Sequence, residues 1–407
     1  MQQTRVLNRL TIVAALGYFV DLYDMALYNV LKLSSLGEIG LSGTALLNAE
    51  IVLGNWQNFG MLLGGLLWGI IGDKRGRLTV LFGSIVTYSL ANIANAFVTH
   101  APDPYTAYAF CRFMAGFGLA GELGAGITLV AETLSKEKRG YGTMLVVAFG
   151  LLGAVTAASV GTLTHWKTTY IIGGVLGLLL LFLRIGTFEP DMFAKTKEDG
   201  VERGNFFMLL RPPHISKYLL VIMTGLPIWF ASGIMVAFSN RFAQASGVHD
   251  AVAIATAAVA FNVGLSGGDF LSGWLSQILH TRKRVMMGFQ TALLVMILWI
   301  LLSPPVSSFV YYAYIFVLGI ACGYWAIFVT NAAEQFGTNI RSTVANTAPN
   351  FVRGSLVPMA LLFKYLYPSM GLVPAALLIG GSVGLIAIIA TSRIPETYGK
   401  ELDYVEQ

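Results

Sequence analysis

The stretch GIIGDKRGR, residues 69–77, separates two apolar runs and shows how this chain is built. The run before it covers about residues 47–72, and the run after it covers about residues 78–99. Each is long enough for an α-helix that spans a bilayer, which takes about 20 apolar residues. The basic side chains between the runs are costly in lipid. The stretch therefore predicts a short polar turn between two membrane-spanning helices.

The whole chain has the composition of a polytopic membrane protein. Of its 407 residues, 56% are hydrophobic and 12% are charged, whereas a soluble domain has about 25% charged residues. Its mean hydropathy is +0.69. Apolar runs of the required length predict twelve spans, at about residues 10–32, 47–72, 78–99, 104–133, 142–164, 167–187, 217–241, 251–278, 285–303, 307–332, 343–366 and 371–392.

The basic residues predict the orientation of these spans. With twelve spans both termini lie on one side, and 20 of the 26 Lys and Arg residues fall on that side, against four on the other. The positive-inside rule then places the termini and the central loop in the cytoplasm, as in a bacterial-type inner membrane. Because the positive charge follows the membrane topology, the pI of 9.1 does not indicate a nucleic-acid partner.

Cysteine and histidine give no sign of a metal or redox site. Cys111 and Cys322 both fall in predicted spans, and all five histidines fall in loops or at helix ends. The chain also lacks a His-Glu metal motif, a nucleophile elbow and a phosphate-binding loop. We therefore expect no metal ion, no cofactor and no enzyme activity, and we expect a monomer.

The chain is predicted to consist of two similar halves. A polar linker, residues 189–216, separates a six-helix bundle at residues 1–188 from a second one at residues 217–407. Glu132 is followed seven residues later by Arg139, and Glu334 is followed by Arg341 at the same interval.

Other residues repeat at nearly the same offset. Gly121 recurs as Gly323 at an offset of 202, and Asn58 recurs as Asn262 at an offset of 204. Internal repeats of this kind are typical of transporters whose halves rock about a central site.

Three motifs resemble the major facilitator superfamily. Residues 69–77 match its signature G-x-x-x-D-[RK]-x-G-R, span four reads RFMAGFGLAGE over residues 112–122, and residues 395–402, PETYGKEL, resemble the P-E-T-x-G-x-x-L of sugar porters and organic-ion transporters. The chain looks like the branch that holds sugar porters, metabolite–proton symporters and organic-ion transporters. The resemblance implies an all-α fold of twelve transmembrane helices in two pseudo-symmetric six-helix bundles.

The loop motif predicts a gate on the cytoplasmic side. Gly69 permits close helix approach, and the Asp73 carboxylate suits the positive N-terminus of a facing helix. A simpler interpretation, a basic topological anchor, explains the positive charges but not Asp73. The residues predicted to form the gate are Gly69, Asp73, Arg77, Glu132, Arg139, Glu334 and Arg341.

Charged residues inside spans usually face a cavity, pair with one another and mark substrate or proton paths. The acids well inside spans are Asp21, Asp24, Glu122 and Asp269, and the bases are Arg112 and Arg353. The residues predicted to couple transport to protons are Asp24, Asp21, Arg112, Glu122 and Asp269.

Asp24 is the principal candidate for the proton switch. In sugar–proton symporters, an aspartate beside a tyrosine on helix one pairs with an arginine on helix four, and Tyr23-Asp24 and Arg112 resemble that pair. The alternatives are a permanent salt bridge that joins two helices and an exposed vestibule site. Asp21 shares the face of Asp24. Asp269 is either a second coupling site or a gate residue paired with a cytoplasmic base.

Arg353 indicates an anionic substrate. It shares a polar helix face with Asn346 and Asn350. It resembles the base on helix eleven of organic-anion carriers, and a guanidinium binds a carboxylate in bidentate fashion. Its alternative role is to pair with Asp269 or Glu122. Further candidates for the substrate site, which helix–helix packing explains as well, are Tyr28, Asn58, Trp229, Asn262 and Trp325.

These observations predict a proton-coupled symporter that imports a small carboxylate-bearing metabolite, an organic acid or an amino acid, by alternating access. Its partners are the substrate, protons and the lipid bilayer. A proton-driven exporter or an uncoupled facilitator of a small polar solute, such as a sugar, nucleoside or organic cation, is the alternative. A membrane receptor is a more distant one.

Overall fold

The structure is a computed structural model that describes residues 6–135, 138–184, 203–248 and 250–406. The described chain is helical and contains no β-strand. Each of the twelve predicted spans coincides with one helix or with two or three consecutive helical segments. Residues 189–202 of the predicted linker lie outside the described residues.

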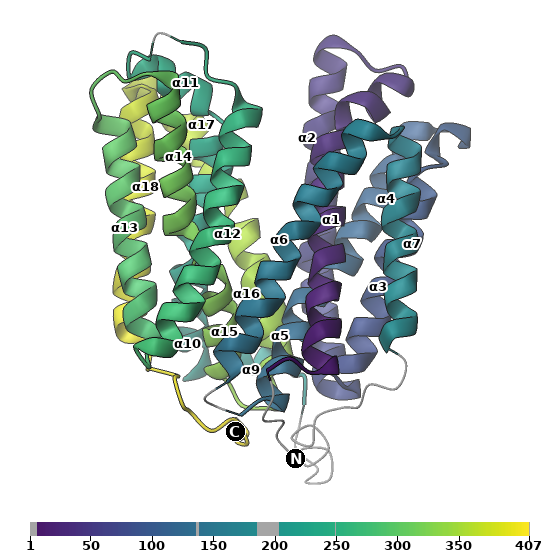
Figure 1. The fold of residues 1–407 in the computed structure, drawn as a ribbon, viewed down its shortest axis with the longest axis vertical. Coiled ribbons are helices and arrows are strands. Elements are labelled where there is room, and N and C mark those ends of the chain that lie inside the picture. Colours follow the sequence, from purple (N-terminus) through teal and green to yellow (C-terminus); the bar gives the residue numbers. More distant parts are fainter. Residues whose placement is uncertain (1–5, 136–137, 185–202, 249, 407) are drawn as a thin grey trace. The chain divides into compact units, whose positions relative to one another are not determined.

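The chain divides into two compact units, which are considered separately. Unit 1 comprises residues 1–208, 336–350 and 401–407. In it, α1 packs along α6 and α2 along α4 (Figure 1). Its helices are α1 (Arg9–Glu38), α2 (Gly43–Arg75), α3 (Arg77–Asn95), η1 (Val98–His100), α4 (Pro104–Leu119), α5 (Glu122–Thr133), α6 (Arg139–Leu163), α7 (Trp166–Arg184) and the first part of α16 (Arg341–Gly354).

Unit 2 comprises residues 209–335 and 351–400. In it, α12 packs along α14, and α18 packs along both α10 and α13. The short helix α9 (Phe206–Leu209) leads into this unit. Its further helices are α10 (His214–Phe230), the π-helical turn η2 (Ala231–Val236), α11 (Ser239–Ala245), α12 (Ile254–Ile278), α13 (Lys283–Leu302), α14 (Ser308–Cys322), α15 (Trp325–Glu334), α17 (Leu356–Met370) and α18 (Leu372–Arg393).

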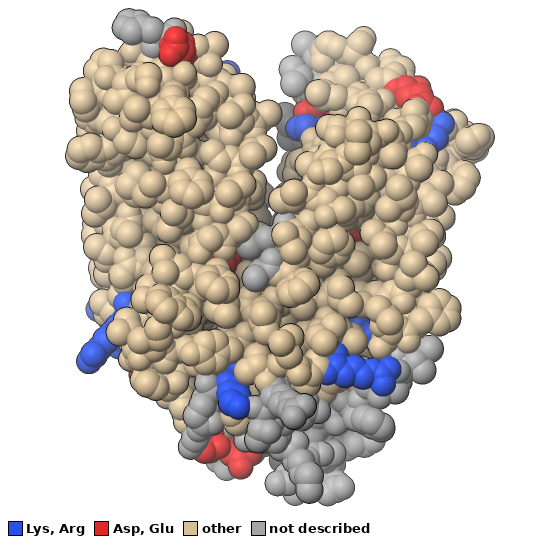
Figure 2. Space-filling view, in the orientation of Figure 1, with Lys and Arg blue, Asp and Glu red and all other residues tan. Residues whose placement is uncertain are grey.

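Within the described residues, ten helical segments are long and apolar enough to cross a membrane. The face shown in Figure 2 agrees with this, because charged side chains are scarce along the sides of the helices and gather toward their ends. The chain is therefore a multi-pass integral membrane protein.

The two units have other bounds than the predicted bundles. The predicted linker is divided between the units after residue 208, and residues 336–350 and 401–407, which the sequence places in the second bundle, belong to unit 1. The physical reason is that α2 and α5 supply buried charged groups to these residues, notably Asp73 to Thr343 and Glu132 to Arg341. Sequence order alone does not reveal such contacts.

Two spans are broken at the repeated glycines. α4 ends at Leu119 and α5 begins at Glu122, on either side of Gly121. In the second half, α14 ends at Cys322 and α15 begins two residues after Gly323. Each break exposes the N–H groups of a new helix start inside the span, where water is scarce and a partner is needed.

The break at Gly323 is packed closely against α12. A Cβ placed on Gly268 would lie 2.9 Å from the Gly323 Cα, whereas a Cβ placed on the neighbouring Gly267 would have no atom within 4 Å. We therefore expect Gly268→Ala to lower the stability of the purified protein by about 1–3 kcal/mol through overpacking. Thermal unfolding in detergent measures this, with Gly267→Ala as the matched control. Equal melting temperatures for the two variants would contradict the packing described here.

Candidate functional site

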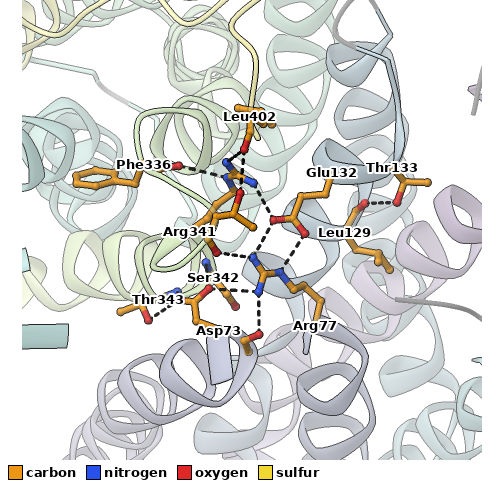
Figure 3. A network of polar contacts seen from close by, with 12 residues as sticks. Asp73, Arg77, Leu129, Glu132, Thr133, Phe336, Arg341, Ser342, Thr343 and Leu402 are labelled. Atoms are coloured by element: carbon orange, nitrogen blue, oxygen red, sulfur yellow. Dashed lines mark hydrogen bonds and ion pairs between the residues drawn. The ribbon is translucent and has the colours of Figure 1, made fainter. Parts of the chain in front are cut away.

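Asp73, near the end of α2, binds the start of α16. Its carboxylate accepts hydrogen bonds from the backbone N–H groups of Ser342 at 2.9 Å and Thr343 at 2.8 Å, and from the Thr343 hydroxyl at 2.7 Å (Figure 3). These N–H groups have no partner within α16, and the helix dipole makes this end positive. Asp73 therefore caps a helix that is far from it in sequence.

Burial raises the pKa of Asp73 from 3.8 to about 6, against the opposing effects of the Arg77 charge and the hydrogen bonds from Thr343 and Ser342. Asp73 lies just beyond the predicted span at residues 47–72. At pH 7 the ionised form predominates, which is the form best suited to accept three hydrogen bonds.

Glu132 joins two arginines beside this cap. Arg77 donates to both carboxylate oxygens, at 2.8 and 3.1 Å, and lies 3.3 Å from Asp73. Arg341 donates to the same carboxylate at 2.8 Å. All four side chains are buried, and they point toward one another in Figure 3. We call Asp73, Arg77, Glu132, Arg341 and Thr343 the latch.

Glycine allows the helices of the latch to approach. A Cβ on Gly69 would lie 2.7 Å from the Thr343 Cα, closer than any side chain tolerates. Gly69 in the signature motif is thus required by the backbone of α16. Of the other predicted gate residues, Arg139 is buried at the start of α6.

The C-terminal segment also holds the latch. The carbonyl oxygen of Leu402 accepts hydrogen bonds from Arg341 at 2.5 Å and from the Thr338 hydroxyl at 2.9 Å. The backbone N–H of Thr338 donates to the Tyr404 carbonyl at 2.8 Å, and the Thr338 carbonyl accepts from Arg77 at 3.0 Å. Residues 402–404 therefore fix the loop that precedes α16.

Unit 2 contains an Arg–Glu ion pair that corresponds to the Arg77–Glu132 pair of the latch. Glu334, the repeat counterpart of Glu132, lies 3.4 Å from Arg282. Arg282 also donates to the Ser276 hydroxyl at 2.9 Å, much as Arg77 donates to the Gly72 carbonyl at 2.9 Å. The repeat therefore extends to the basic partners and to their acceptors, at offsets of 205 and 204.

The PET motif has a structural role in unit 2. The Glu396 carboxylate accepts hydrogen bonds from the backbone N–H groups of Arg282 at 2.9 Å and Lys283 at 3.1 Å, and from the Thr281 hydroxyl. Burial by itself raises the pKa of Glu396, but these hydrogen bonds outweigh it and lower the pKa. Glu396 therefore caps the start of α13 as an anion.

Asp21 and Asp24 lie in a buried acid cluster of unit 1. Both are buried on α1, Asp24 is within Coulombic range of Asp21 and Arg112, and Asn92 of α3 lies beside Asp24. A Cβ on Gly173 of α7 would lie 2.6 Å from an Asp24 oxygen, so the carboxylate rests against that helix.

The predicted ion pair between Asp24 and Arg112 does not form. Arg112 instead donates to the Gln57 side-chain oxygen at 2.5 Å and lies over the Tyr28 ring at 5.0 Å from its centroid. The Tyr28 hydroxyl in turn donates to the Glu50 carbonyl at 2.7 Å. The guanidinium of Arg112 thus affects Asp24 only through its charge, because it is hydrogen-bonded to the neutral side-chain amide of Gln57 on α2.

Glu122 has a different partner from any that the sequence suggested. It forms a buried ion pair with Arg184, the last residue of α7, and accepts a hydrogen bond from Ser84 at 3.3 Å. Arg184 is one of the 20 basic residues that the sequence places on the side of the termini. Its burial shows that a base at the end of a span can turn inward when an acid of another helix neutralises it.

The polar stripe of α16 serves two different surroundings. Asn346 donates to the Ser342 carbonyl at 2.9 Å, and Asn350 donates to the Asn346 carbonyl at 2.7 Å and to the Ala120 carbonyl at 3.4 Å. Both asparagines are buried in unit 1. Arg353, by contrast, belongs to unit 2.

Arg353 lies against two indole rings. Its guanidinium carbon lies 5.9 Å from the Trp229 ring centroid and 5.7 Å from that of Trp325, within the range of cation–π contacts. The two rings meet edge to face at 6.3 Å. The Trp229 Nε1 is buried and has no hydrogen-bond acceptor in the described chain. We call Arg353, Trp229 and Trp325 the aromatic cage.

Three other predicted site residues lie outside these groups. Asp269 is buried and accepts a hydrogen bond from the Ala326 N–H at 3.0 Å. The predicted pairing of Asp269 with a base is absent from the part of the chain that the structure describes. Asn58 and Asn262 are exposed on α2 and α12, and Asn262 donates to Ala258 of its own helix.

Sequence reasoning missed Gln57, Arg184 and Arg282. The burial period of α2 would have identified Gln57, because it follows Leu53 and precedes Gly60 and Gly64 at helical spacing on the buried face. Arg282 corresponds to Arg77 at an offset of 205, one residue more than the offset of 204 that relates Asn58 to Asn262, so the repeat did not align the two arginines. No local signal marks Arg184.

Removing one charge from the latch provides a direct test of its strength. We expect Glu132→Gln to lower the stability of the purified protein by about 3–5 kcal/mol, because two buried guanidinium groups lose the carboxylate that they share. Hydrogen exchange at residues 336–345 should increase with it. The matched control is Glu50→Gln, which breaks a partly exposed pair with Lys32 at 2.9 Å and should cost less than about 1 kcal/mol. Similar losses in both variants would contradict a tight latch.

Comparison with known proteins gives consistent results. The model of the family described as "Major Facilitator Superfamily" matches residues 14–353. A "Putative metabolite transport protein" of Haemophilus influenzae is 26% identical over 96% of both chains. A "3-(3-hydroxy-phenyl)propionate transporter" of Escherichia coli is 31% identical over 35% of each chain.

The structure of the proton:xylose symporter XylE covers 97% of both chains with a TM-score of 0.75 at 15% identity, which shows a shared fold. Since the family model matches most of the chain, this protein belongs to the major facilitator superfamily and is a membrane transporter, not an enzyme.

Proposed function

We propose that this transporter of metabolites or sugars imports a small carboxylate-bearing metabolite together with protons. The observation that carries the proposal is the aromatic cage, in which the guanidinium carbon of Arg353 lies 5.9 Å from the Trp229 ring centroid and 5.7 Å from that of Trp325. A guanidinium in apolar surroundings binds a carboxylate strongly. The indole N–H of Trp229, which lacks an acceptor in the described chain, is suited to donate a second hydrogen bond to the substrate.

The chemistry of one relative supports this substrate class. The name of the Escherichia coli protein, a 3-(3-hydroxy-phenyl)propionate transporter, describes a substrate with a carboxylate. A cage of indole rings offers both apolar surface and a cation to such a molecule. The role of three further predicted substrate residues, Tyr28, Asn346 and Asn350, is then structural support of unit 1.

The acid cluster is the proposed proton site. Asp21 and Asp24 are buried within Coulombic range of each other. Two neighbouring carboxylates resist being ionised together, so such a pair is suited to take up and release a proton. Arg112 modulates Asp24 through its charge, and its hydrogen bond to Gln57 at 2.5 Å provides an alternative resting place for the guanidinium.

The latch is the proposed gate on the side of the termini, which the positive-inside rule assigns to the cytoplasm. Its four charged groups bind one another in the structure, so it is engaged in this state. Opening it requires Asp73 to release the start of α16 and Glu132 to release Arg341. A network of this size lets one conformational step break many contacts together.

The substrate assignment can be tested with matched pairs of acids and amides. We expect benzoate and nicotinate to raise the melting temperature of the purified protein, and benzamide and nicotinamide to have no effect. Arg353→Gln should weaken carboxylate binding about 10- to 100-fold, since a charge-assisted hydrogen-bonded contact contributes about 1.5–3 kcal/mol. The matched control is Arg241→Gln, an exposed arginine 5.6 Å from the Phe238 ring. Equal stabilisation by acids and amides, or by organic cations, would refute the proposal.

The coupling role of Asp24 can be tested in proteoliposomes. A proton carried through 100 mV supplies about 2.3 kcal/mol, enough for about 50-fold accumulation of substrate. We expect Asp24→Asn to abolish this accumulation while substrate exchange continues, because the amide cannot exchange a proton. The control is Asp103→Asn at the exposed N-cap of α4, where asparagine caps equally well.

Proton-driven uptake by Asp24→Asn at the wild-type level would exclude Asp24 as the proton switch. The sign of the accompanying pH change reports the direction of coupling. Alkalinisation of the medium on adding substrate supports symport, and acidification would indicate an exporter that works by antiport.

A further inference from the structure

Asp269 is a buried acid that the proposed gate and proton site leave without a role. It projects from α12 and accepts the backbone N–H of Ala326 at 3.0 Å and that of Trp325. These are the first N–H groups of α15 (Trp325–Glu334), which otherwise lack a partner at a helix start. Tyr324, at the N-cap position of α15, provides no side-chain cap. The cap therefore comes from another helix.

The backbone geometry places Asp269 at this point. Its neighbour Gly268 lies against the break between α14 and α15, where an added Cβ would be 2.9 Å from the Gly323 Cα. Because two glycines bring the backbones together there, the next side chain of α12 reaches the open end of α15. The carboxylate meets the positive pole of a helix, where it is well stabilised.

The first half of the chain lacks such an acid at the equivalent position. The repeat offset of 204 relates Asp269 to Gly65. The space next to Gly65 is taken by Asn350, whose amide would lie 2.6 Å from a Cβ on Gly65 and which donates to Ala120 at the break between α4 and α5. The acidic cap is thus a special feature of the half that contains the aromatic cage.

The helix that Asp269 caps begins with a residue of the cage. Trp325 is the first residue of α15. Its ring centroid lies 5.7 Å from the guanidinium carbon of Arg353, and 6.3 Å and 5.1 Å from the ring centroids of Trp229 and Phe328. The backbone of Trp325 is fixed by the same carboxylate that accepts the N–H of Ala326. The direction of the indole therefore depends on the cap.

We propose that Asp269 is a positioning residue: it holds the start of α15 so that the Trp325 indole lies against Arg353, and it does not exchange protons during transport. The inference rests on the proposed function, because the cage is the proposed anion site. It separates Asp269 from the acid cluster, with which the sequence had grouped it.

The test compares two variants of Asp269. Asp269→Asn keeps a side-chain oxygen that can accept an N–H, whereas Asp269→Ala removes the acceptor. The structural readout is the near-UV circular dichroism of Trp325, obtained by subtracting the spectrum of Trp325→Phe. The functional readouts are the affinity for benzoate and the proton-driven uptake of benzoate in proteoliposomes. Asp250→Ala, at an exposed acid of unit 2, is the control.

We expect Asp269→Asn to retain the Trp325 signal and proton-driven uptake. Asp269→Ala should lose most of the Trp325 signal and bind benzoate about tenfold more weakly, because the Trp325 indole no longer lies against Arg353. Loss of proton-driven uptake in Asp269→Asn with an intact Trp325 signal would overturn the proposal and make Asp269 a proton site. An unchanged Trp325 signal in Asp269→Ala would overturn it as well.

The outcome stays decisive if Asp269→Ala does not fold, because Asp269→Asn alone separates positioning from proton exchange. If benzoate and the other carboxylates do not bind the wild-type protein, the proposed function fails. In that case the circular dichroism of the two variants still tests whether Asp269 orients Trp325.

Discussion

The rest of the structure depends on carboxylates that bind the N-termini of other helices. Asp73 caps α16, Asp269 caps α15 and Glu396 caps α13. A helix start inside or at the edge of a membrane leaves N–H groups that lipid cannot satisfy. An acid from a neighbouring segment satisfies them and gains from the helix dipole. Each cap therefore satisfies an open helix end and fixes the position of one helix against another part of the chain. At Asp73 and Asp269 it also stabilises a buried charge.

The same requirement explains why so many arginines are buried in a membrane protein. Three of these arginines are fully buried, and each forms an ion pair with an acid. Glu132 pairs with Arg77 and Arg341, and Glu122 pairs with Arg184. A guanidinium with several donors can serve a carboxylate and backbone carbonyls at once, as Arg341 does with Glu132 and Leu402. The latch is strong because all its members are satisfied together, and the loss of one leaves the others buried with fewer partners.

The two halves use one design for different purposes. Both break a span at a repeated glycine, and both place an Arg–Glu pair near the following helix. At the break, however, the first half has Gly65 and the second half has Asp269. Unit 1 concentrates carboxylates on α1, with Asp21 and Asp24, while unit 2 contains the cage of indoles around Arg353. This asymmetry within a repeat is consistent with proton exchange in one unit and anion binding in the other.

The sequence by itself determined the spans, the repeat, the superfamily and the residues of highest interest, because apolar runs, charge placement and the loop motif are local patterns with direct physical meaning. It brought Arg353, Trp229 and Trp325 into one candidate site, and Asp73 and Glu132 into another. Only the tertiary structure decided the partners. Arg112 binds Gln57 in place of Asp24, Glu122 binds Arg184, and Asp269 caps α15. Pairing of this kind depends on which helices touch and on the rotation of each about its axis, and neither is encoded in the spacing of residues along one helix.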